Sequence, residues 1–406
     1  MASPLEGIRV LDVTAFQQGP AAGMYLADMG AEVIKVEDPV RGDPGRGVMS
    51  LLGSLMGSPT TGINFYFEAH NRNKKGIAVD LKKEGGREAI YRLIPRCDVF
   101  LSNYLPETLE GLGLGYATLS RLNPRLIYAL ASGYGPKGPD KARRSFDLAA
   151  QARGGLMSIL SEAGQPPVDA GTGTADQVGG LMLAYGVVSA LLHRERTGEG
   201  QEVNACLLGS LISIQSMWLQ AFLVSGQLPA KVPRAQARNP FWNTYRARDD
   251  KWFILSMARS DDVWPTLCRV LGLGPLERDP RFDTHDRRLE NGRELIAILD
   301  RVFATWARQE LLPRLEEEGV ICAPVNTYRE VAQDPQVIIN EYITQVDHPV
   351  AGRCRMVGIP IHFSQTPVSV ARPAPQLGQH TEEILLELGG YTWEEITALK
   401  EAEAII

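Results

Sequence analysis

The first 37 residues alternate between strand-like and helix-like segments, and this alternation constrains the fold more than any other feature of the sequence. Residues 8–13 (IRVLDV) and 31–37 (AEVIKVE) are rich in β-branched side chains and have the composition of buried strands. Residues 21–29 between them form a helical segment that ends before Gly30. Two strands joined through a helix run parallel with a right-handed crossover. The opening segment therefore predicts an α/β domain with a parallel sheet.

The alternation continues through the first half of the chain, which extends the predicted sheet. The further expected elements are strands at residues 76–81, 98–102, 126–132 and 200–206, and helices at 83–94 and 179–196. Repeated strand and helix segments of this length are typical of an α/β layered domain.

The character of the sequence changes after the first half. Residues 226–240 are polar and interrupted by prolines, which indicates a linker or an ordered loop. A smaller unit is expected over residues 241–325, with a tryptophan-containing strand pair followed by charged amphipathic helices at 260–272, 290–307 and 308–318. Strand-like sequence then returns, and a last helix is expected from Thr381.

Composition and motifs exclude several classes of function. The net charge of −6 gives no overall electrostatic footprint for nucleic acid or an anionic membrane. The five cysteines form no CxxC pair and the six histidines no HExxH motif, so no disulfide framework or metal site is expected. The start lacks a signal-peptide pattern, and the apolar stretch Ala205–Val224 contains glutamines and serines, which predicts a buried core helix. We expect a cytoplasmic protein.

The first strand–helix–strand unit does not have the sequence of a dinucleotide site. Glu37 ends the second strand where a ribose-binding acid stands in such sites. Residues 17–23 read QQGPAAG, however, and not GxGxxG, and Pro20 occupies the turn. We therefore interpret Glu37 as a surface residue at a strand end.

Two segments have the composition of ligand-binding loops. Residues 71–75 (NRNKK) carry three cations and two asparagines, which suits a phosphate, but the charge alone is more typical of a solvated loop. Residues 132–139 (SGYGPKGP) form a glycine-rich loop after a strand, where backbone N–H groups can approach a ligand.

Asp176 lies in a glycine-rich loop, residues 171–180 (GTGTADQVGG), that opens directly into the long helix. One interpretation is a helix N-cap, a common use of aspartate at this position. The other is a carboxylate among backbone donors, which stays ionised and acts as a nucleophile. The two roles are compatible, and the local sequence does not separate them.

Several long motifs occur together and in one order along nearly the whole chain. They are LEGIRVLDVT, QQGPAAGMYLADMGAEVIKVEDPVRGD, NRNKKGIAVDLK, SNYLPETLEGLGLGYATLSRLNPRLIYALASGYGPKGP, ADQVGGLMLAYGVVSALLHRERTGEGQEV, ICAPVNTYREVAQDPQ and LGQHTEEILLELG. This combination resembles the family III CoA-transferases of the CaiB/BaiF type.

The resemblance implies a particular architecture. A large Rossmann-like domain would be built from residues 1–225 and 326–406, with a small α+β domain inserted over residues 226–325 together with its linkers. Two chains would interlock like rings, as a homodimer or as a heterodimer with a homologous subunit.

The resemblance also implies an activity, the transfer of CoA from an acyl-CoA to a carboxylic acid, with CoA as a substrate and no tightly bound cofactor or metal. Asp176 falls on the family's nucleophilic aspartate, which would form an anhydride and then an aspartyl-CoA thioester. Gln17 falls on a side chain near that carboxylate. The expected CoA contacts are Asn73, Lys74, Lys75, Asn103, Tyr104, Gly135 and Lys137.

Some positions depart from the family's formate- and oxalate-specific members. Those members have four consecutive glycines in a loop over the site, and residues 226–245 contain nothing similar. Asp140 and Asp38 stand where they have tyrosine and arginine. One alternative is an α-methylacyl-CoA racemase, but Phe146 stands where racemases have a histidine, and phenylalanine carries no proton to exchange. Another alternative is a non-catalytic subunit of a heteromeric transferase, which the retention of Asp176 disfavours.

Overall fold

The computed structural model describes residues 3–51, 53–58, 60–171 and 173–406. Contacts divide the chain into two compact units. Unit 1 comprises Met1–Leu160, Pro167–Gln227 and Ile338–Ile406, and unit 2 comprises Ser161–Pro166 and Leu228–Val337. The chain returns to unit 1 at Ile338, later than residue 326.

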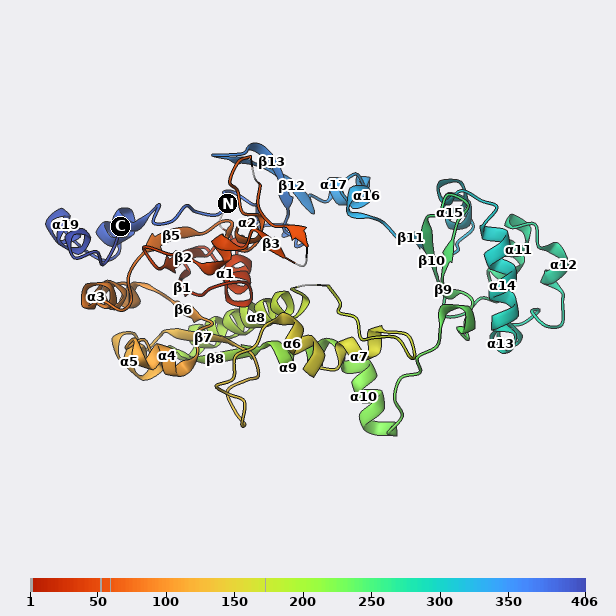
Figure 1. The fold of residues 1–406 in the computed structure, drawn as a ribbon, viewed down its shortest axis with the longest axis horizontal. Coiled ribbons are helices and arrows are strands. Elements are labelled where there is room, and N and C mark those ends of the chain that lie inside the picture. Colours follow the sequence, from red (N-terminus) through yellow and green to blue (C-terminus); the bar gives the residue numbers. More distant parts are fainter. Residues whose placement is uncertain (1–2, 52, 59, 172) are drawn as a thin grey trace. The chain divides into compact units, whose positions relative to one another are not determined.

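Unit 1 is built on a six-stranded sheet in the order β5-β2-β1-β6-β7-β8 (Figure 1). Every neighbouring pair is parallel, which confirms the predicted parallel sheet. The strands are β1 (Arg9–Val13), β2 (Glu32–Glu37), β5 (Lys75–Ala78), β6 (Val99–Ser102), β7 (Ile127–Ser132) and β8 (Gln201–Cys206). Because β1 lies inside the sheet, the carboxyl ends of β1, β6 and β7 are neighbours at one edge.

Helices cover both faces of this sheet, because its strands send alternate side chains to opposite sides. In β1, Val10 belongs to a core shared with α1 and α8, whereas Leu11 belongs to a core shared with α3, α18 and α19. The last two helices come from the end of the chain and cover the same face as α3 (Figure 1). The helices that contribute to these two cores include α1 (Gln18–Asp28), α3 (Glu84–Leu93), α8 (Thr174–Thr197), α18 (Thr381–Glu387) and α19 (Trp393–Glu401).

The remaining helices, turns and hairpins complete unit 1. They are the helices α2 (Phe65–Asn71), α4 (Pro106–Gly111), α5 (Tyr116–Leu122), α6 (Asp147–Arg153), α7 (Leu156–Leu160), α9 (Leu207–Ile214) and α10 (Ser216–Ser225), with 3-10 turns at Pro44–Gly47 and Ile94–Arg96. Two antiparallel hairpins pair β3 (Ser50–Leu51) with β4 (Ser54–Leu55) and β12 (Ile343–His348) with β13 (Gly352–Val357).

Two sequence expectations about apolar and charged residues in unit 1 are wrong. Ala205–Val224 is not one core helix, because β8 ends at Cys206 and α9 and α10 follow with a bend of 78° between them. No residue of α10 is buried. Glu37 is not a surface residue, because its carboxylate is buried and accepts two hydrogen bonds from Arg46 and one from the Asp43 N–H.

The 24-residue helix α8 is the only unbroken helix among the described residues that is long and apolar enough to cross a membrane by length and composition alone. It packs on the sheet and on α1 through Leu183, Val187 and Leu191. Its other face carries exposed apolar side chains, among them Leu181, Tyr185, Val188 and Leu192.

Unit 2 has its own core around a three-stranded antiparallel sheet in the order β11-β10-β9. The strand pair expected near Tyr245 and Trp252 is confirmed as β9 and β10. The elements are β9 (Trp242–Arg246), β10 (Trp252–Ser256), α11 (Trp264–Val270), α12 (Gly274–Glu277), α13 (His285–Glu290), α14 (Gly292–Phe303), α15 (Arg308–Glu317), β11 (Cys322–Pro324), α16 (Tyr328–Val331), the 3-10 turn Arg234–Gln236 and, at the boundary with unit 1, α17 (Pro335–Ile339).

Candidate active site

A cavity of about 640 Å³ lies in unit 1 where the carboxyl ends of the central strands meet. Ala15, Asn103 and Ser132 line it at the ends of β1, β6 and β7, and Asp176 lines it from the first turn of α8. In open α/β sheets, ligands bind outside the carboxyl ends of the strands. This cavity is therefore the candidate active site.

Asp176 is carried by the first turn of α8 but does not cap the helix. Gly173 occupies the N-cap position with φ of 88°, a left-handed conformation that glycine adopts without strain. The cap is supplied by α6: the Asp147 carboxylate accepts hydrogen bonds from the N–H groups of Ala175 (2.6 Å) and Asp176 (3.2 Å). The N-cap interpretation of Asp176 is therefore wrong, and its side chain is left free for the cavity.

The environment of Asp176 opposes its negative charge. Burial, and secondly the charge of Asp147, raise the pKa of Asp176 to about 7. Among the described residues, none donates a hydrogen bond to the Asp176 carboxylate, so no such bond offsets these effects. A carboxylate that is partly desolvated and unpaired in a cavity is a reactive group, because it has lost part of the solvation that stabilises its charge.

Gln17 packs directly against the start of α8. A Cβ atom added at Gly173 would lie 2.3 Å from Gln17 Nε2, so only glycine leaves room for this side chain. Gln17 is buried, lines the cavity and follows Phe16, whose φ of 64° is in the left-handed region. The Phe16 ring meets the Phe146 ring edge-on at 5.9 Å, and both rings line the cavity.

Three of the expected CoA contacts lie at this cavity. Asn103, Tyr104 and Gly135 line it, whereas Lys137 is exposed and is not among its lining residues. Asn103 also binds the backbone of Ala15, accepting from its N–H (2.9 Å) and donating to its carbonyl (2.6 Å). The predicted contacts at Asn103, Tyr104 and Gly135 thus have a place at the cavity, and their role toward CoA stays a prediction.

The basic segment 71–75 does not line the cavity. Lys74 is fully buried, and its ammonium is bound by the Asp12 carboxylate (2.8 Å), the Pro20 carbonyl (2.8 Å) and the Asn71 side chain (2.9 Å). Burial lowers the pKa of Lys74 to about 8 despite the attraction of Asp12. The expectation that Lys74 contacts CoA is therefore wrong, because the ammonium has no exposed surface and is held by internal partners.

The neighbours of Lys74 also bind within the chain. Lys75 forms ion pairs with Glu32 (3.0 Å) and Glu383 (2.7 Å). Asn73 donates to Asp28 (2.9 Å) and accepts from the backbone of residues 371 and 372. Both keep some access to solvent, so CoA contacts by Asn73 and Lys75 stay predictions.

The sequence analysis missed several residues of the site. Tyr66 lines the cavity, and burial, with Asp176 as the next cause, raises the pKa of its phenol. Lys141, Arg143 and Arg144 line the cavity as well. These three cations are visible in the sequence as KARR just before Phe146, and a search for basic runs next to the glycine-rich loop at 132–139 would have found them.

The comparisons with known proteins agree with this geometry. The model of CoA-transferase family III matches residues 5–381. The chain belongs to CoA-transferase family III.

Two curated members of family III cover nearly the whole chain. The chain is 35% identical over 390 residues to the succinyl-CoA:glutarate CoA-transferase of Homo sapiens, covering 96% of this chain and 86% of that protein. It is 32% identical over 418 residues to the formyl-CoA:oxalate CoA-transferase of Streptomyces coelicolor, covering 100% of both.

A solved structure has the same fold. The crystal structure of a CAIB/BAIF family protein from Brucella suis matches with a TM-score of 0.84 and 31% identity, covering 96% of this chain and 100% of that chain. The resemblance to the CaiB/BaiF type noted in the sequence is thereby confirmed. Among the described residues, no group of three or more His, Cys, Asp or Glu side chains is placed to hold a metal ion.

Proposed function

We propose that the chain transfers CoA from an acyl-CoA thioester to a carboxylic acid, with Asp176 as the covalent nucleophile. The observation that carries the proposal is the Asp176 carboxylate itself, unpaired among the described residues and partly desolvated in a cavity of about 640 Å³. Membership of CoA-transferase family III supports the class of reaction.

The proposed reaction needs only carboxylate and thiolate exchange. Asp176 attacks the thioester carbonyl carbon, the C–S bond breaks, and CoA thiolate leaves a mixed anhydride on Asp176. The thiolate then attacks the aspartyl carbonyl carbon, releases the first carboxylic acid as its carboxylate and leaves an aspartyl-CoA thioester. The acceptor carboxylate attacks this thioester and repeats the two steps in reverse, which returns Asp176 as a free carboxylate.

Each attack passes through a tetrahedral oxyanion, which hydrogen-bond donors placed in advance stabilise. Gln17 supplies a side-chain amide, and Tyr66 supplies a phenol that burial and Asp176 keep protonated. The anhydride also needs shielding from water. The facing rings of Phe16 and Phe146 provide apolar walls of the cavity for this purpose.

The cations of the cavity support an acceptor with a second anionic group. Lys141, Arg143 and Arg144 line the same cavity as Asp176. A dicarboxylic acid would place its second carboxylate among them. The human relative is named for succinyl-CoA and glutarate, both of which carry a second carboxylate.

A dimer is the second part of the proposal. Exposed apolar side chains on α10, namely Met217, Trp218, Leu223 and Val224, and on the outer face of α8 support burial against a second copy of the chain. The resemblance stated above supports the interlocked form of that dimer.

The test is an exchange screen by mass spectrometry, in which acyl-CoA donors are incubated with single carboxylic acids. Asp176→Ala should abolish transfer, and hydroxylamine should trap the wild-type intermediate on the peptide that carries Asp176. Asp169→Ala, which removes an exposed carboxylate on the preceding loop, is the matched control and should keep the wild-type rate. Transfer by Asp176→Ala at the wild-type rate would contradict the mechanism.

Two further outcomes separate the substrate class and the alternative reaction. Glutarate should be a much better acceptor than pentanoate, and Arg144→Gln should reduce that preference; equal use of the two acids would contradict the dicarboxylate proposal. Inversion of an α-stereocentre without an acceptor acid would instead support the racemase.

A further inference from the structure

A three-residue turn, residues 14–16, leads from β1 into the cavity. A side chain from elsewhere in unit 1 binds the backbone of each of these residues. Lys35 Nζ donates to the Thr14 carbonyl (3.0 Å), and Asn103 binds both backbone groups of Ala15. Asp43 Oδ1 accepts from the Phe16 N–H (3.0 Å). Phe16 needs such support, because the left-handed conformation is unfavourable for a residue other than glycine.

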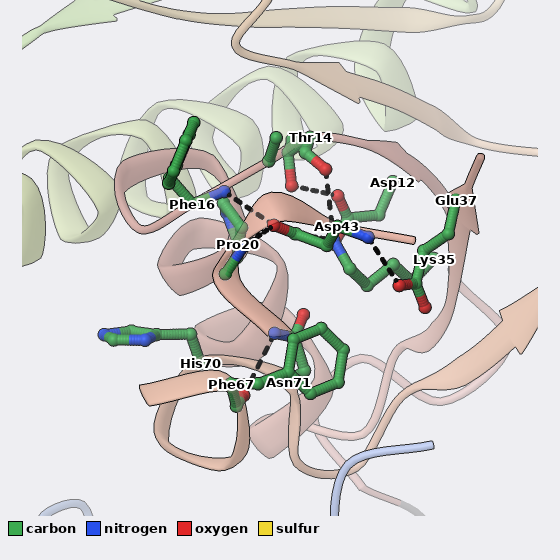
Figure 2. A network of polar contacts seen from close by, with 12 residues as sticks. Asp12, Thr14, Phe16, Pro20, Lys35, Glu37, Asp43, Phe67, His70 and Asn71 are labelled. Carbon is green, nitrogen blue, oxygen red and sulfur yellow. Dashed lines mark hydrogen bonds and ion pairs between the residues drawn. The ribbon is translucent and has the colours of Figure 1, made fainter. Parts of the chain in front are cut away.

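One buried ion pair provides two of these contacts. Asp43 Oδ2 lies 2.7 Å from Lys35 Nζ, and neither side chain is exposed by more than 1%. Figure 2 shows Asp43 between the Phe16 backbone and the Lys35 ammonium, with Lys35 reaching on to Thr14. Asp43 also accepts from the Gly45 N–H (2.7 Å), so its own position is fixed by the turn at Pro44–Gly47.

The charges of this pair are held in place by their surroundings. Burial opposes the charge of both groups, but their mutual attraction outweighs it and raises the pKa of Lys35 and lowers that of Asp43. Asp12 and Glu37 add to the attraction on Lys35. The pair therefore stays charged near neutral pH, and its hydrogen bonds to the turn are charge-assisted.

The turn determines where Gln17 lies. Phe16 is followed at once by Gln17, and α1 begins at Gln18. The Gln17 amide fills the space beside Gly173, three residues before Asp176. A change in φ at Phe16 would redirect the chain at Gln17 and remove its amide from the start of α8.

We propose that Asp43 is a positioning residue for the transfer reaction, which holds Phe16 in the left-handed conformation and thereby keeps Gln17 beside Asp176. The inference rests on the proposed function for its effect on rate. Its structural part, that Asp43 sets the turn, is testable whether or not the chain transfers CoA.

The kinetic test is a double-mutant cycle between Asp43→Asn and Gln17→Ala. Asp43→Asn should lower kcat by about tenfold or more with a change in KM below about threefold, since it disturbs a group that acts on the transition state. In the Gln17→Ala background the same substitution should change kcat by less than about twofold, because coupled residues are not additive. Retained kcat, or two effects that multiply, would overturn the proposal.

Asp98→Asn is the matched control. Asp98 also accepts from a backbone N–H, that of Arg9 (2.8 Å), and pairs with a buried cation, Arg194 (2.9 Å), but it lies at the opposite end of β1. This variant should lower the unfolding temperature and keep kcat within about twofold, since it leaves the turn intact. An equal loss of kcat in Asp98→Asn would show that any buried ion pair of unit 1 matters in the same way.

A crystal structure of Asp43→Asn tests the positioning role of Asp43 separately from the proposed transfer of CoA. It should show Phe16 outside the left-handed region and Gln17 moved from Gly173; an unchanged turn overturns the inference even if the wild type transfers CoA. A wild type that transfers no CoA refutes the proposed function alone. If Asp43→Asn does not fold, Asp43→Leu with Lys35→Met removes both charges, which is often neutral for stability, and the same loss of kcat and the same displaced turn are expected.

Discussion

Asp176→Asn should stabilise the folded protein, and the gain should grow with pH. Asparagine has nearly the shape of aspartate but is neutral at every pH. Burial and Asp147 raise the pKa of Asp176 from 3.8 to about 7, so the folded state holds a proton that the unfolded state releases within this range. The contribution of Asp176 to the stability of the wild type must therefore fall as the pH rises from about 4 to above 7.

The size of the effect follows from the two pKa values. A pKa of about 7 against 3.8 corresponds to at most about 4 kcal/mol, reached once the pH exceeds the folded-state value. The partial exposure of Asp176 reduces this figure, because water screens a charge at the cavity surface. At about pH 4.5, less than one unit above the unfolded-state pKa of 3.8, only about a quarter of this difference between variant and wild type should have developed.

The assay is urea unfolding of both proteins at about pH 4.5 and about pH 8.5. A substitution that leaves the titrating groups unchanged should alter the free energy of unfolding by the same amount at both pH values. Asp169→Asn, which makes the same substitution at an exposed position of the preceding loop, is the control. If Asp176→Asn is no more stable than wild type at the higher pH, the carboxylate is not in a destabilising environment. The argument for a reactive, partly desolvated nucleophile would then fail.

Three further outcomes are expected. Lys74→Met should lower the free energy of unfolding by about 3 kcal/mol, because it leaves Asp12 without its ion pair. The KM for acyl-CoA should stay unchanged. A raised KM would show that the Lys74 ammonium reaches the ligand. Burial lowers the pKa of His70 to about 4, so the contribution of His70 to stability should fall by up to about 3 kcal/mol as the pH falls from about 6.5 to 4. Urea unfolding should therefore show His70→Gln gaining on the wild type by about this amount over the same pH range. Trp218→Asp on exposed α10 should give monomers in analytical ultracentrifugation, and an intact dimer would contradict the assigned surface.

The parallel sheet was predictable from the sequence because its strands are continuous apolar runs separated by helices, a pattern that few other folds produce. The strand pair of unit 2 was predictable for a similar local reason. The helix expected over Ala205–Val224 was not, because composition does not show where a strand ends or where two helices bend by 78°. Contacts between residues far apart in the sequence determine where β8 ends and where the two helices bend. The local propensities of the residues do not reveal such contacts.

In the candidate site as well, the sequence points to some residues, whereas contacts between distant residues decide the roles of others. Asp176 was singled out by the glycine-rich loop around it, and Gln17 by the resemblance to the family. The role of Asp147 was not, because its hydrogen bonds to the first turn of α8 join residues 28 and 29 positions apart. The resemblance to the family gave Lys74 a ligand role, whereas the structure buries its ammonium against Asp12, which the sequence places 62 residues away.

The charged groups of unit 1 fall into two kinds with different consequences for catalysis. Lys35 and Asp43 are buried with partners that hold their charges fixed, so they define geometry at any pH near neutrality. Asp176 is only partly exposed and has no positive partner among the described residues, so its charge is costly, and burial and Asp147 raise its pKa to about 7. A carboxylate of this second kind gains most from bonding to carbon, because forming the anhydride or thioester removes the unfavourable charge. In the proposed reaction, we expect the fixed pair to keep Gln17 in place while that charge disappears and returns.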